Sequence, residues 1–180
     1  MACGKDFLMD NTPIEVEQYI RREVERQHDK PGYVGMVLAW QYAMGNRHDL
    51  PDENDACILA YYIKDHEQAN VITGSNNYRH TNVAVDGGMR VIGSKPADIP
   101  RQMHLLFEVL TEDHGNRMLD WSVNDFTKQL LEIHPWVDGN GRTASIIRNW
   151  LLGTLETPSD LPYYFGEAPQ EGETDESDRG

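Results

Sequence analysis

Nine consecutive residues combine an acid–base group, a carboxylate, a guanidinium and two glycines in one polar stretch, His134-Pro135-Trp136-Val137-Asp138-Gly139-Asn140-Gly141-Arg142. An imidazole with its ordinary pKa near ~6.5 can take a proton from a hydroxyl at neutral pH, so His134 is predicted to be a general base. Glycines that open a helix let an anion approach backbone N–H groups that lack partners within the helix. Gly139 and Gly141 therefore predict a phosphate site.

The polar neighbours of these glycines suit the same chemistry. Asn140 adds a neutral donor, and Arg142 adds a planar, permanently charged fork that matches phosphate oxygens. Asp138 would repel a polyphosphate unless a divalent cation lay between them. We therefore predict that Asp138 is a magnesium ligand.

Two helices are expected to position this stretch. The first helix is predicted to begin after Ser122, which would act as its N-cap, and to place His134 at its C-terminal end. Its apolar face consists of Val123, Phe126, Leu130 and Ile133. The second helix begins at the glycines and ends at Gly153, a residue typical of helix C-termini. Its apolar face consists of Ile146, Ile147, Trp150 and Leu151.

The stretch resembles the signature of the Fic family, His-x-Phe-x-Asp/Glu-Gly-Asn-Gly-Arg-x-x-Arg, with Trp136 at the aromatic position. The resemblance implies a mainly α fold, a Fic-type helical bundle with one short β-hairpin beside the active-site loop. It also implies a protein nucleotidyltransferase that moves AMP from ATP onto a Ser, Thr or Tyr hydroxyl, with Mg²⁺ as cofactor and ATP as co-substrate. His134 would deprotonate the hydroxyl and Asp138 would hold the metal. The phosphates would be bound by Gly139, Asn140, Gly141 and Arg142.

One position departs from the signature, because Ser145 stands where the family has its last arginine, which steadies the γ-phosphate. Arg148 lies one turn further along the helix, roughly 60° away around the axis, and is the predicted substitute for binding phosphate. Two alternatives follow from Ser145. The protein could transfer another nucleotide or a phosphate, or it could be a nucleotide-binding interaction module. His134 and Asp138 argue against the module, because binding alone needs no base.

A β-hairpin is predicted where the sequence period changes, with strands over 82–85 and 89–92 joined by Asp86-Gly87-Gly88. The segment resembles the flap of Fic proteins, which pairs like an added strand with the modifiable segment of a target protein. The residues expected to bind a target in this way are Val83, Ala84, Val85, Arg90 and Val91.

Further helices are predicted from the capping box at Thr12 to about Gln27, and over 34–44, 56–63 and 99–110. We expect a single domain over 1–165, with the motif region at 71–152. An acidic tail over 166–180 is expected to be disordered.

Composition limits the partners and the compartment. A net charge of −14 argues against binding to nucleic acid or to an anionic membrane. Two cysteines, no apolar run of membrane-spanning length and no signal-peptide pattern predict a cytoplasmic protein.

Fic proteins often carry an inhibitory helix with the pattern Ser/Thr-x-x-x-Glu-Gly/Asn. Glu53-Asn54 and Glu171-Gly172 do not complete it, because the residues four positions earlier are Asp49 and Glu167. If activity is controlled, we therefore expect a separate, antitoxin-like protein to do it.

Overall fold

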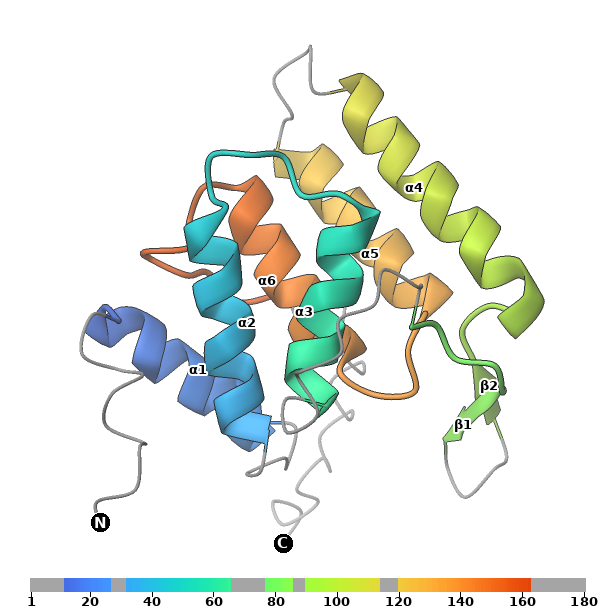
Figure 1. Cartoon of the computed structure of the whole chain (residues 1–180), viewed down its shortest axis with the longest axis horizontal. Helices are drawn as coiled ribbons and strands as arrows, with labels where there is room; N and C mark the ends of the chain where they lie inside the picture. Colours follow the sequence, from blue (N-terminus) through green and yellow to red (C-terminus); the bar gives the residue numbers. More distant parts are fainter. Residues whose placement is uncertain (1–11, 27–31, 66–76, 86–89, 114–119, 163–180) are drawn as a thin grey trace, which may run out of the picture.

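Helices make up most of the computed structural model, which describes residues 12–26, 32–65, 77–85, 90–113 and 120–162 (Figure 1). The elements are α1 (Ile14–Arg26), α2 (Tyr33–Gly45), α3 (Glu53–Asp65), β1 (Val83–Val85), β2 (Arg90–Ile92), the 3₁₀ turn η4 (Pro96–Asp98), α4 (Ile99–Asp113), α5 (Asp120–Ile133) and α6 (Asn140–Leu151). The expectation of a mainly helical fold with one short hairpin is confirmed. None of the described helices is both long enough and apolar enough to cross a lipid bilayer.

Helix α6 forms the centre of the bundle and packs against α2, α3 and α5. Its side chains are buried on nearly every face, including the polar Ser145 and Asn149. The helix ends at Leu151, and Gly153, two residues further on, has a φ of 68° and donates its N–H to the carbonyl of Trp150, as expected of a glycine that closes a helix C-terminus. Because α6 starts at the glycine-rich loop, the core of the domain also fixes the position of that loop.

The outer helices cover the two sides of this centre, with α1 against α2 and α4 against α5 (Figure 1). Aromatic contacts join each pair. The rings of Tyr19 and Trp40 lie 5.2 Å apart between α1 and α2, and those of Phe107 and Phe126 lie 5.2 Å apart between α4 and α5. These buried rings contribute much of the apolar area that holds the outer helices in place.

Strands β1 and β2 form an antiparallel pair beside the amino-terminal start of α4 (Figure 1). Val83 pairs with Ile92, and Ala84 pairs with Val91. The predicted turn residues lie outside the described residues. Backbone bonds from Arg79 to Pro135 and from Ser94 to Ile133 place the hairpin next to the loop that follows α5.

Helix boundaries differ from the predicted ones in two instructive places. Helix α3 starts at Glu53 rather than at 56, because Asp52 and Asp55 cap it reciprocally: each backbone N–H donates to the other's carboxylate, at 2.9 and 2.8 Å. Helix α5 starts at Asp120, so Ser122 lies inside the helix and is not its N-cap. The predicted domain limits stay a prediction, and the acidic tail lies outside the described residues.

Candidate active site

His134 leaves helix α5 in an unusual backbone conformation. Its φ is 52°, in the left-handed region that residues other than glycine rarely adopt, while its N–H still donates to the carbonyl of Leu130 at 3.1 Å. Such strain persists only where surrounding contacts hold it, and it concentrates at functional sites. The side chain thus leaves the helical register at the start of the loop.

The imidazole of His134 is half-buried, and its pKa lies below the ordinary value. Burial is the main cause, and the positive charge of Arg79 acts in the same direction. A hydrogen bond to the backbone of Leu131 and the charge of Asp138 act in the opposite direction. The result is a neutral ring at pH 7, which can accept a proton at its unprotonated nitrogen.

The loop between His134 and α6 is braced from within. The side-chain amide of Asn140 accepts the N–H of Trp136 at 3.0 Å and donates to the carbonyl of the same residue at 2.8 Å. Trp136 in turn donates its ring N–H to Asn77, at 2.9 Å. Asn140 was predicted to donate to a phosphate; its buried amide is instead occupied with the loop, and its predicted contact with phosphate stays a prediction.

The amino end of α6 has the geometry expected of an anion site. Its first backbone bond runs from the N–H of Thr143 to the carbonyl of Gly139, at 2.9 Å, so the N–H groups of residues 140–142 precede the helical ladder. Gly139 has a φ of 80°, and a Cβ there would lie 2.9 Å from Cγ2 of Ile63. Only glycine fits this position without strain.

Asp138 and Arg142 form the charged part of the loop. The carboxylate of Asp138 is 61% exposed, whereas the side chain of Arg142 is 1% exposed, and their nearest oxygen and nitrogen lie 3.4 Å apart. The other oxygen of Asp138 accepts the N–H of Gly139 at 2.6 Å. A buried guanidinium therefore supplies fixed positive charge below the loop, while the carboxylate faces solvent.

An exposed carboxylate beside a candidate phosphate site would fit Mg²⁺, which keeps several waters and commonly binds through one or two carboxylates plus substrate phosphates. No group of three or more potential metal-ligating side chains is found among the described residues. Asp138 is the residue that would hold the ion, with phosphate oxygens and water completing the shell.

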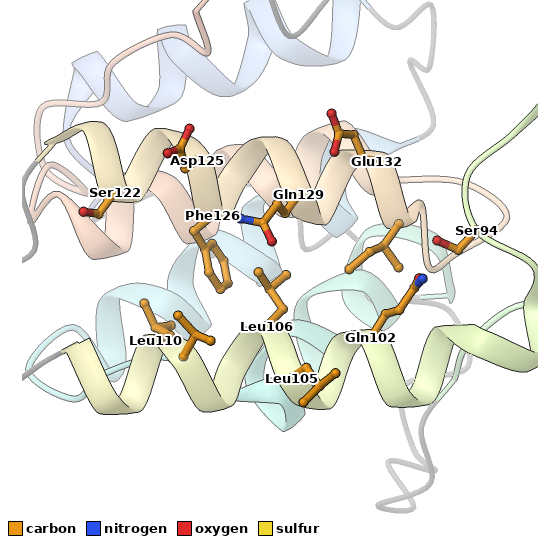
Figure 2. Close-up of a pocket in the computed structure, with 12 residues that line it drawn as sticks. Ser94, Gln102, Leu105, Leu106, Leu110, Ser122, Asp125, Phe126, Gln129 and Glu132 are labelled. Carbon is orange, nitrogen blue, oxygen red and sulfur yellow. The ribbon is translucent and has the colours of Figure 1, made fainter.

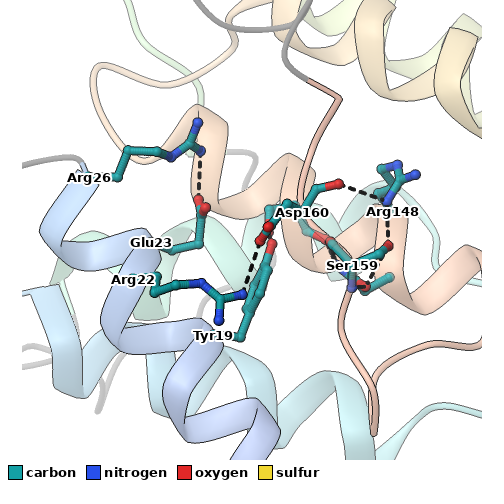
Figure 3. A network of polar contacts seen from close by, with 9 residues as sticks. Tyr19, Arg22, Glu23, Arg26, Arg148, Ser159 and Asp160 are labelled. Atoms are coloured by element: carbon teal, nitrogen blue, oxygen red, sulfur yellow. Dashed lines mark hydrogen bonds and ion pairs between the residues drawn. The ribbon is translucent and has the colours of Figure 1, made fainter.

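Ser145 lies away from solvent, on the side of α6 that faces α1. It is fully buried, and its hydroxyl shares a hydrogen bond of 2.5 Å with the hydroxyl of Tyr19. Around this pair Figure 3 shows ion pairs that join Arg22 to Asp160 and Arg26 to Glu23. The position of the missing arginine is therefore occupied by a packed, hydrogen-bonded pair.

Arg148 points its guanidinium toward α5 and the segment after α6. It donates to Asn124 at 3.0 Å, to the hydroxyl of Ser159 at 2.7 Å and to the carbonyl of Asp160 at 3.4 Å (Figure 3). These bonds use the fork that was predicted to bind phosphate. The predicted role of Arg148 stays a prediction.

A separate groove of about 560 Å³ runs between α4 and α5 (Figure 2). Apolar side chains such as Leu106 and Phe126 line it, and it extends to Ser94 and Ile133. Its lining residues do not include His134 or the α6 amino end, so the groove is distinct from the anion site.

Of the predicted flap residues, Ala84 and Val91 lie opposite each other in the hairpin and both are exposed, Val91 to 59%. Val83 is half-buried. Val85 and Arg90 are paired in register, and their backbones complete the short ladder. Binding of a target by these residues stays a prediction.

The site consists of His134, with its strained backbone, and the amino end of α6, which one braced loop joins. The β1–β2 hairpin lies beside this loop. This arrangement defines a class of helical domain in which a histidine and a helix amino end face one loop.

A sequence profile of the Fic/DOC family matches residues 52–152, more than half of the chain, so the protein belongs to the Fic/DOC family. Two solved structures show the same fold. One is a Fic-domain-containing signalling protein from Bacteroides thetaiotaomicron, with 23% identity and a TM-score of 0.51. The other is a Fic family protein from Desulfovibrio desulfuricans, with 16% identity and a TM-score of 0.52.

The two alignments cover 69% and 80% of this chain but 46% and 49% of the neighbours, so the chain spans about half of their length. No functionally curated protein matches the chain. Family membership supports a transferase of the Fic type. Family membership does not specify which group is transferred.

Proposed function

We propose that the domain transfers AMP from ATP to a Ser, Thr or Tyr hydroxyl of a target protein. The hydroxyl oxygen bonds to the α-phosphorus while the bond to the oxygen that bridges to the β-phosphate breaks, and pyrophosphate leaves. The hydroxyl proton moves to the free nitrogen of His134. When bound at Asp138, Mg²⁺ supplies positive charge to the phosphates.

One observation carries this proposal: the imidazole of His134 and the amino end of α6 lie at the two ends of a single braced loop. A site that only bound phosphate would gain from a protonated histidine. A ring that burial and the charge of Arg79 keep neutral suits a group that accepts a proton during reaction.

Transfer of a different group is the second candidate, and the Tyr19–Ser145 contact favours it. Ser145 presents no cation and is itself buried, so a γ-phosphate receives no charge from this position. A donor other than ATP, or transfer of a phosphate, would tolerate that loss better than AMP transfer would.

The partners follow from the same proposal. A target segment would pair with the exposed side of the hairpin, where backbone bonds can hold many sequences. We also infer a cytoplasmic location, where ATP and magnesium are available, and a separate antitoxin-like protein as regulator. The net charge of −14 supports neither nucleic acid nor anionic membrane as a partner.

The test incubates purified protein and magnesium with ATP labelled at the α- or the γ-phosphate, and measures the mass added to the protein or to a target. Label from the α-position, lost in His134→Ala and retained in the exposed-histidine control His48→Ala, would support AMP transfer. Label from the γ-position would select phosphate transfer. No added mass with any nucleotide, despite nucleotide binding, would leave an interaction module and refute the proposed reaction.

A further inference from the structure

The hairpin and the histidine loop are joined at three consecutive carbonyl groups. The carbonyl of Ile133 accepts the N–H of Ser94 at 3.0 Å, that of His134 accepts Nε of Arg79 at 2.7 Å, and that of Pro135 accepts the N–H of Arg79 at 2.9 Å. Two of the donors are backbone groups, one on each side of the hairpin. The backbone around His134 is thus fixed by the hairpin as much as by α5.

Arg79 is the centre of this junction. Besides His134, its guanidinium donates to the carbonyl of Thr81, before β1, at 2.8 Å and to that of Ser94, after β2, at 2.5 Å. One planar fork therefore binds both legs of the hairpin and the histidine. Arg79 is 3% exposed, so these bonds are protected from competition with water.

Gly93 allows the close approach that the junction needs. Its φ is 75°, and a Cβ there would lie 2.6 Å from Cβ of His134 and 2.8 Å from Nη2 of Arg79. No side chain can separate the hairpin from the histidine at this point. The two backbones therefore lie in direct contact.

We propose that Arg79 is a positioning residue that locks the hairpin to His134, so that a target held on the hairpin meets the imidazole at one fixed separation. This inference rests on the proposed function, because it assigns the hairpin to the target and the imidazole to the proton. A displacement of about 1 Å between such groups can cost on the order of a hundredfold in rate.

The charge of Arg79 has a second effect at the same place. Two charged groups act on the imidazole: Arg79 lowers its pKa and Asp138 raises it. Removing the positive charge should leave Asp138 unopposed, and the pKa of His134 should then rise. Position and protonation of the imidazole therefore depend on one side chain.

The experiment compares Arg79→Lys, which keeps the charge but not the three-way fork, with Arg79→Met, which loses both. Arg47→Met is the control, since Arg47 is exposed and bonds locally to the carbonyl of Met44. Histidine ring signals followed by NMR against pH report the pKa of His134 without any need for activity. Transfer assays report kcat and the KM values for nucleotide and target, and thermal unfolding confirms that each variant folds.

We expect both Arg79 variants to lose at least about tenfold in kcat and to show a raised KM for the target, with the KM for nucleotide unchanged. The pKa of His134 should rise in Arg79→Met and stay near the wild-type value in Arg79→Lys. If Arg79→Met does not fold, Arg79→Lys still tests the fork through kcat and the target KM.

Wild-type kinetics in folded Arg79→Lys, or an unchanged His134 titration in Arg79→Met, would overturn the inference. If the wild type transfers nothing but the titration shifts as described, the proposed reaction fails while the link between Arg79 and His134 stands.

Discussion

Tyr19 and Ser145, 126 positions apart in the chain, share a hydrogen bond at the contact between α1 and α6. Both residues are fully buried. The position where the Fic signature has its last arginine is therefore part of the packing core. Restoring that arginine is a structural change as much as a chemical one.

We expect Ser145→Arg to destabilise the protein by at least about 3 kcal/mol, because it inserts a large, charged side chain into a filled and buried position. For a domain of this size the melting temperature should fall by roughly 6 °C or more. Ser145→Ala should cost about 1–3 kcal/mol, since it leaves the Tyr19 hydroxyl buried without this partner. Ser145→Arg should reduce the free energy of unfolding less in the Tyr19→Ala background, which opens space, than in the wild type. Equal costs in the two backgrounds would mean that Tyr19 is not what excludes the arginine.

Activity should persist into mildly acidic solution. The pKa of His134 is lowered, mainly by burial, so the ring stays neutral and able to accept a proton at pH values somewhat below its ordinary ~6.5. A plot of kcat/KM against pH should therefore show its acid limb below that value. An acid limb above 6.5, or one that survives in His134→Ala, would assign the titration to another group.

The same shift has a consequence for stability. Because the folded protein binds the proton more weakly than the unfolded chain, the contribution of His134 is fully present above about 6.5 and is lost as pH falls through the lower folded-state value. Denaturant unfolding at several pH values should show this loss reduced in His134→Ala.

Three glycines allow steric and conformational costs to be separated. Gly139→Ala should destabilise by about 1–3 kcal/mol or more, because it combines a positive φ with a contact to Ile63. Gly153→Ala has a positive φ but nothing within 4 Å of the new Cβ, so it should cost less. Gly45→Ala meets neither problem and should be neutral or stabilising by under ~1 kcal/mol. Denaturant unfolding of the three variants should give this order, and nucleotide binding should weaken only in Gly139→Ala.

Asp138→Asn tests the magnesium assignment with little disturbance of the loop, since an amide oxygen can still accept the N–H of Gly139. We expect the magnesium concentration for half-maximal activity to rise about tenfold or more, because the substitution removes the charged ligand. Asp49→Asn, at an exposed position, is the matched control. An unaltered magnesium requirement in Asp138→Asn would place the ion elsewhere.

The sequence was informative where the signal is local. Helical spacing located α5 and α6, and the glycines between them located the loop that follows His134. The alternating pattern around Val83 and Val91 located the two strands of the hairpin, but not their register. Each of these features depends on neighbours within a few positions, which periodicity and turn preferences describe well.

Long-range polar contacts could not be predicted in this way. The bond from Arg79 to His134 spans 55 positions, and the residues around Arg79 in the sequence do not indicate which carbonyl groups it binds. The phosphate-binding role of Arg148 is predicted from its angle around the helix axis. Its partners Asn124 and Ser159, however, come from segments whose placement only the folded bundle determines. Asn140 was judged by its chemistry, whereas the loop itself uses its amide.

Because α6 supplies the amino end of the candidate anion site and also forms the centre of the core, its residues have little freedom to vary independently. Substitutions that adapt such a domain to a new donor or target should destabilise it least at solvent-facing positions such as Val91 and Val137, which are 59% and 51% exposed. Sequence divergence among such domains should therefore be concentrated at the exposed residues of the loop and the hairpin, while the sequence of α6 stays nearly constant.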